Sequence, residues 1–151
     1  MNGRAEPLKM QPSRRYTIYA VTIGVWLTGV LWLIYHYFLA TQGKFGRVAN
    51  PLELWWLKLH GAFSFAAIFA IGLLWSSHIL RGWNVNWRRW SGGTLAGAAI
   101  VLTLTGYGEY YIDGQTWRDW NGVIHWVVGL AALAAFFIHW LSKSLPKRVK
   151  S

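Results

Sequence analysis

The 151-residue chain contains no cysteine, which excludes disulfides, iron–sulfur clusters, thioether-linked haem and zinc–thiolate sites. Charge is also scarce, since Asp, Glu, Lys and Arg make up 13% of the residues, against about 25% in a soluble domain. Linkers rich in Gly, Ser or Pro and tandem repeats are absent as well. What the chain does have is 54% hydrophobic residues and 12 tryptophans. This composition indicates a single domain in a lipid environment.

Long apolar segments dominate the sequence, at about residues 17–40, 54–80, 91–108 and 122–142. Each is close to or above the roughly 18 apolar residues that cross a hydrocarbon core about 30 Å thick. The short segments of alternating polarity typical of a transmembrane barrel are not visible. The sequence therefore predicts an all-α integral membrane four-helix bundle, with flexible tails at residues 1–13 and 145–151.

The basic residues predict the orientation of this bundle. Of the 15, four lie in the N-terminal tail, three between the second and third apolar segments and four in the C-terminal tail. The opposite side carries the other four, together with four of the five acidic residues. The excess of Lys and Arg on one side places both termini in the cytoplasm of a multi-pass protein of the bacterial inner membrane. The net charge of +10 is then a topology signal, and nucleic-acid binding is not expected.

All five histidines fall within the apolar segments, where an ionisable side chain is costly and indicates function. His60 and His78 are 18 residues apart, and His125 and His139 are 14 apart. At about 100° per residue, both members of each pair lie on one face of their helix. The second and fourth segments both run from outside to inside. The outer His60 is therefore expected to face His125, and the inner His78 to face His139.

Two pairs of histidines at different depths suit two b-type haems, because haem iron takes two axial imidazole nitrogens without a covalent link to protein. A closed zinc site instead needs four ligands at one point. Gly129, one turn after His125, offers room for a flat porphyrin, and Arg81, close to His78, offers a cation for a propionate. A single haem is the alternative, with His78 as an interfacial histidine.

His36 lies near the outer end of the first apolar segment, and its role has three readings. It replaces a ligand of the outer haem, accepts a proton in a quinone pocket, or makes hydrogen bonds between helices. Tyr107 and Glu109 are predicted at the same side of the membrane. Together with His36 they form a candidate quinone and proton site, because they combine aromatic walls with proton-accepting groups.

The fourth-segment pattern, His125 and His139 with Gly129 one turn after the first, resembles the four-helix cytochrome b subunits of formate dehydrogenases and nickel–iron hydrogenases. The resemblance implies that both histidines ligate haem and that the outer partner is His60 on the second helix. The family's inner partner lies on the first helix, where residues 17–29 of this chain contain no histidine. His78 would have to take that role.

By this resemblance, the expected function is electron transfer across the bilayer between a periplasmic cytochrome or dehydrogenase subunit and the quinone pool. The chain would then be a subunit of an oxidoreductase complex in a respiratory chain. One alternative is a self-contained quinone-linked haem oxidoreductase, which would be active as an isolated chain. Another is a haem-free membrane scaffold or transporter subunit, although the polar midplane site of a transporter is not apparent.

Overall fold

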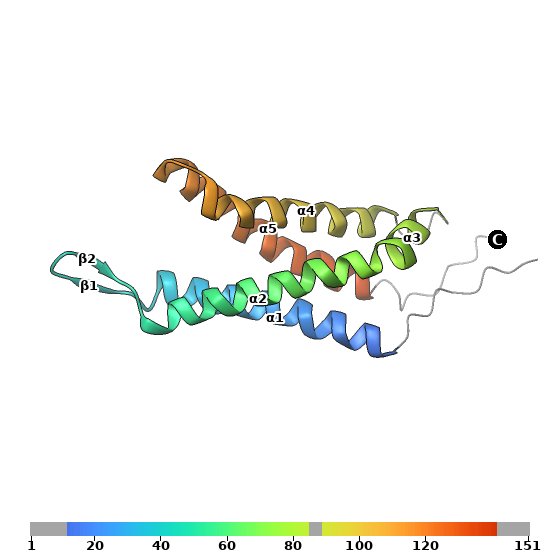
Figure 1. The fold of residues 1–151 in the computed structure, drawn as a ribbon, viewed down its shortest axis with the longest axis horizontal. Coiled ribbons are helices and arrows are strands. Elements are labelled where there is room, and N and C mark those ends of the chain that lie inside the picture. Colours follow the sequence, from blue (N-terminus) through green and yellow to red (C-terminus); the bar gives the residue numbers. More distant parts are fainter. Residues whose placement is uncertain (1–11, 85–88, 142–151) are drawn as a thin grey trace, which may run out of the picture. The chain divides into compact units, whose positions relative to one another are not determined.

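The computed structural model describes residues 12–84 and 89–141, without the side chains at positions 77, 81, 82 and 89. The chain divides after His78 into two units, each of which contains a pair of packed helices (Figure 1). The two units are described separately below. The expected flexible tails lie outside the described residues, except that Pro12 and Ser13 already belong to the first helix.

The first unit is a hairpin of helices α1 (Pro12–Tyr37) and α2 (Pro51–Leu74), which pack against each other (Figure 1). A small antiparallel ribbon of β1 (Thr41–Gly43) and β2 (Gly46–Val48) connects them. Gly46 has a φ of 110°, which glycine adopts without a steric penalty, and it allows the two-residue turn of the ribbon. The first helix ends three residues before the predicted end at residue 40, and the ribbon begins at Thr41.

Helix α2 begins with a conventional N-terminal cap. The side chain of Asn50 accepts a hydrogen bond of 3.0 Å from the backbone N–H of Leu52, and Pro51 occupies the first turn, where its missing N–H costs nothing. At its other end α2 continues into a π-helical segment, η1 (Trp75–Leu80), and then into the short α3 (Arg81–Asn84). The second predicted span is therefore helical throughout but not uniformly α-helical.

The second unit pairs α4 (Arg89–Tyr111) with α5 (Gln115–Leu141). A three-residue connection joins them and ends at Gly114, whose φ of 87° again requires the freedom of glycine. Helix α5 begins before the predicted span, and a 2.7 Å hydrogen bond from Gln115 Nε2 to Asp119 Oδ1 stabilises its first turns.

Three helices, α1, α2 and α5, are long and apolar enough to cross a membrane. Helix α4 has 23 residues but does not belong to this set, so the predicted span at residues 91–108 stays a prediction. Among the described residues no large apolar side chain is buried, and the two buried polar side chains are those of Thr28 and Asn121. Large apolar side chains instead point outward along the helices, as expected for surfaces in contact with lipid.

Candidate functional site

His60 lies on α2, half-buried against α1 in the first hairpin. Its Nδ1 is 2.9 Å from the carbonyl oxygen of Val25 and 3.4 Å from Oγ1 of Thr28. A carbonyl only accepts hydrogen bonds, so Nδ1 carries the proton and donates it to Val25. The neutral imidazole then has its lone pair on Nε2, which is the form in which histidine binds a metal through that atom.

His125 repeats this arrangement on α5 of the second hairpin. Its Nδ1 lies 2.8 Å from Oγ1 of Thr105 on α4. The hydroxyl of Thr105 already donates its only hydrogen to the carbonyl of Val101, at 2.8 Å. Both contacts are satisfied together only if the hydroxyl oxygen accepts a hydrogen bond from Nδ1–H of His125. The lone pair of this imidazole is therefore also on Nε2.

The two remaining predicted ligands have different surroundings. His139, near the end of α5, has its Nδ1 2.9 Å from Oγ of Ser91 on α4. His78 is half-buried in the π-helical segment η1. The angle of about 100° per residue applies to an α-helix, and the i→i+5 bonding of a π-helix makes each turn wider. The shared face of His60 and His78 that the sequence predicts therefore does not follow from α-helical geometry alone.

Three tryptophans, on α1, α2 and α5, have buried indole N–H groups. Among the described residues, Nε1 of Trp26, Trp56 and Trp126 has no hydrogen-bond partner. Trp56 precedes His60 by one helical turn, and Trp126 follows His125 directly. A buried indole N–H normally finds an acceptor, so three without one favour a bound group that carries acceptor atoms.

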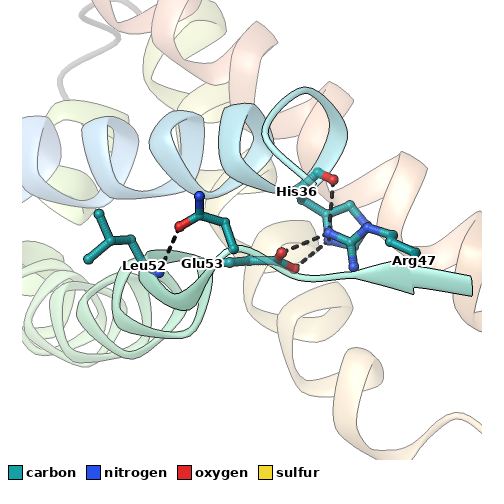
Figure 2. A network of polar contacts seen from close by, with 5 residues as sticks. His36, Arg47, Leu52 and Glu53 are labelled. Carbon is teal, nitrogen blue, oxygen red and sulfur yellow. Dashed lines mark hydrogen bonds and ion pairs between the residues drawn. The ribbon is translucent and has the colours of Figure 1, made fainter. Parts of the chain in front are cut away.

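His36 is part of a polar cluster at the end of the first hairpin that carries the β-ribbon (Figure 2). Its Nδ1–H donates to Oε1 of Glu53 at 2.7 Å, and Arg47 donates to the other carboxylate oxygen at 2.7 Å. Arg47 also donates to the backbone carbonyl of His36 at 2.8 Å. The ring of Trp32 stacks on His36 with centroids 4.6 Å apart. These contacts show His36 in a hydrogen-bonding role between α1 and the residues of the ribbon and α2. Its roles as a haem ligand and as a proton acceptor for a quinone stay predictions.

Glu109 joins a second polar cluster, at the end of the second hairpin where α4 meets α5. The side-chain amide of Asn121, which is 9% exposed, donates to a carboxylate oxygen of Glu109. The same amide donates at 2.8 Å to the backbone carbonyl of Thr105, the residue whose hydroxyl contacts His125. Tyr107 is exposed and stacks on Tyr111, with ring centroids 4.2 Å apart.

The predicted quinone residues thus belong to different units, with His36 in the first and Tyr107 and Glu109 in the second. Gly129 lies against Leu102 of α4, because a Cβ built on it would come within 3.8 Å of Cδ2 of Leu102. This contact is ordinary packing within a hairpin. Arg81 belongs to α3, and its side chain lies outside the described part of the structure.

In the described ranges, no three residues among His, Cys, Asp and Glu gather as metal ligands. Taken separately, His60 and His125 each have the Nδ1–H group directed at an acceptor in their own hairpin, which suits a histidine that binds a metal through Nε2. Val25 and Thr105 were not predicted from the sequence, although one signal for Thr105 exists in the tripeptide Leu-Thr-Gly, which occurs on both α1 and α4.

Comparison with known proteins identifies no relative of this chain. No protein family model matches the chain, and neither a curated protein nor a solved structure gives a significant match.

Proposed function

We propose that this chain is a membrane-embedded b-type cytochrome that transfers electrons across the bilayer. His60 and His125 would be the axial ligands of an outer haem b, and His78 and His139 those of an inner one. The observation that carries the proposal is the hydrogen bonding of Nδ1 in His60 and His125. In each ring Nδ1–H donates a hydrogen bond to a fixed acceptor on the neighbouring helix, which would leave Nε2 as the ligating atom.

Support for the inner pair is weaker. His139 has a hydroxyl at 2.9 Å from its Nδ1, which is the same kind of contact that His125 makes with Thr105. His78 lies in a π-helical segment, and such segments occur frequently at functional sites. A protein with one haem would retain the outer pair and leave His139 and His78 as hydrogen-bonding residues.

The chain's own side chains have three tasks in this proposal. His60 and His125 bind iron, and their hydrogen-bonded Nδ1–H groups raise the basicity of the ligating nitrogen. The buried indole N–H groups of Trp26, Trp56 and Trp126 supply donors for acceptor atoms such as propionates or carbonyls. The apolar helices exclude water, which favours a low dielectric constant around the cofactor. When bound, the haem supplies one-electron exchange.

The proposed orientation follows the basic residues, with both termini in the cytoplasm. A periplasmic cytochrome or dehydrogenase subunit would then exchange electrons at the outer side, and a quinone would be the lipid-soluble partner. Glu109 remains the candidate proton acceptor for the quinone, because a carboxylate held by Asn121 lies close in the chain to Tyr107. Quinol oxidation that is unchanged in both Glu109→Gln and His36→Phe would remove this site.

The test of the proposal is a reduced-minus-oxidised visible spectrum of the purified protein, with haem counted per chain. Two haems are expected, and His60→Ala and His125→Ala should each remove the outer one. His36→Ala is the matched control, because this histidine is engaged by Glu53 and Arg47 and should not be needed for haem. A colourless wild-type protein, or full haem content in both alanine variants, would refute the proposal.

A further inference from the structure

The two hairpins share a short pattern that places a histidine in the same environment. Leu-Thr-Gly occurs at residues 27–29 of α1 and again at residues 104–106 of α4. On the second helix of each hairpin, a histidine is followed by Ser or Gly four positions later and by Ala-Ala at six and seven. The histidines are His60 and His125, and each contacts the Thr-Gly of its own hairpin.

The glycine of each tripeptide lies directly against the imidazole ring. A Cβ built on Gly29 would come within 3.0 Å of Cε1 and 3.1 Å of Nδ1 of His60. A Cβ built on Gly106 would come within 3.3 Å of Cε1 of His125. These distances are tighter than ordinary van der Waals contacts, which begin near 3.4 Å. A side chain at either position would therefore push the ring outward, so glycine sets the depth at which each imidazole sits.

The threonine of each tripeptide presents its oxygen to Nδ1. Thr28 donates its hydroxyl hydrogen to the carbonyl of Gly24 at 2.6 Å, as Thr105 does to Val101 at 2.8 Å. Both hydroxyl oxygens are therefore acceptors toward the ring. Thr28 is also one of the two buried polar residues among those described, with 4% exposure, which fixes its position.

We propose that Thr28-Gly29 and Thr105-Gly106 are paired positioning elements, which we call the histidine cradles. Each cradle fixes the depth, the orientation and the Nδ1–H tautomer of its histidine, so that Nε2 is presented as the ligand atom. This inference rests on the proposed haem function for its consequence, but the tautomer itself can be measured without haem.

The two cradles differ in one respect that makes the proposal testable. The nearer acceptor for His60 is the backbone carbonyl of Val25, at 2.9 Å against 3.4 Å for Thr28, and no substitution removes it. The acceptor for His125 is the side chain of Thr105, at 2.8 Å. Removing the hydroxyl should therefore have a large effect at Thr105 and a smaller one at Thr28.

The experiment compares Thr105→Val with Thr28→Val, Thr105→Ser and Thr103→Val in the full-length protein. Thr103 is the matched control, because it lies on the same helix and makes the same back-bond, to Ala99 at 2.8 Å, but is exposed. Haem affinity is measured by transfer to a haem-scavenging protein. Thr105→Val should weaken affinity by about 10- to 100-fold, the usual effect of losing a partner of a metal-bound histidine. Thr105→Ser should restore it.

A second readout uses the haem-free protein with ¹⁵N-labelled histidine. Wild type should show the Nδ1–H tautomer for His125, and Thr105→Val should lose that preference while Thr103→Val keeps it. Gly106→Ala should likewise weaken haem binding, whereas Gly97→Ala, with nothing within 4 Å of the added methyl, should not. Circular dichroism establishes that each variant is helical.

The outcomes separate the two claims. A wild-type protein that binds no haem overturns the proposed function, and the tautomer of His125 then decides whether the cradle exists. A haem-binding protein in which Thr105→Val behaves like Thr103→Val in both readouts overturns the cradle and leaves the cytochrome proposal standing.

Discussion

The contact between Gly24 and Phe63 offers a test of how α1 and α2 hold the ring of His60. A Cβ built on Gly24 would lie 2.5 Å from Cδ1 of Phe63 and closer still to Cε1, whereas ordinary contact begins near 3.4 Å. Gly24→Ala therefore demands a movement of about 1 Å by the phenyl ring or by the helices. Overpacking of this kind costs about 1–3 kcal/mol. Replacing glycine by alanine in a helix returns about 0.5–1 kcal/mol.

The net expectation for Gly24→Ala is a loss of up to about 2.5 kcal/mol in the free energy of unfolding. Gly72→Ala is the matched control on α2, because nothing lies within 4 Å of the added methyl, and it should be stabilising. The difference between the two variants isolates the clash, since the gain in helix propensity is common to both. Thermal unfolding in detergent, followed by circular dichroism, measures it.

The same substitution should reach His60. Gly24 precedes Val25, whose carbonyl accepts the 2.9 Å bond from Nδ1. If the helices carry the whole movement of about 1 Å, that bond leaves hydrogen-bonding range and haem affinity falls with stability. Adding Phe63→Ala to Gly24→Ala should remove the clash, so the double variant should lose less than the sum of the single losses. If Gly24→Ala is as stable as Gly72→Ala, the phenyl ring turns aside freely and the reasoning is wrong.

Two further predictions concern the polar clusters. Glu53→Gln removes the carboxylate that joins Arg47 to His36. Because Arg47 is partly exposed, the variant should lose no more than about 1 kcal/mol in the free energy of unfolding. The β-ribbon should become more sensitive to limited proteolysis. Protease sensitivity equal to wild type would show that the ion pair does not hold the ribbon. Asn121→Ala leaves the half-buried carboxylate of Glu109 without its amide donor and should lower the free energy of unfolding by about 1–3 kcal/mol in thermal unfolding. An unchanged midpoint would contradict the structural role given to that amide.

The helices themselves were largely predictable, because each follows from a long apolar run. Their ends were not. The first helix ends at Tyr37 rather than at residue 40, since the chain turns into the β-ribbon. The fourth begins at Gln115 rather than at residue 122, because Gly114 ends the connection and polar residues continue the helix beyond its apolar part. Hydrophobicity marks where lipid contact ends, and a helix can extend past that point.

The candidate site was predictable in its histidines but not in what holds them. Val25 contributes only a backbone carbonyl, so no side-chain pattern could identify it. Thr105 is one of several threonines on α4, and although the repeated Leu-Thr-Gly sets it apart from Thr103, only the packing of α5 shows that it contacts His125. The π-helical segment around His78 depends on a local change in backbone hydrogen bonding. The prediction of a shared face assumed a regular α-helix and could not include this change.

The hydrogen bonds to His60 and His125 each close within a single hairpin, and this has a consequence for assembly. The first helix pair can fix the orientation of the His60 ring while the second pair is still being synthesised. Neither pair depends on the other to orient its histidine. A porphyrin that arrives last would then meet rings already immobilised, and the entropy lost on capture would be smaller. Late insertion of the cofactor into a preformed protein would be fast, and the apoprotein would keep its helices.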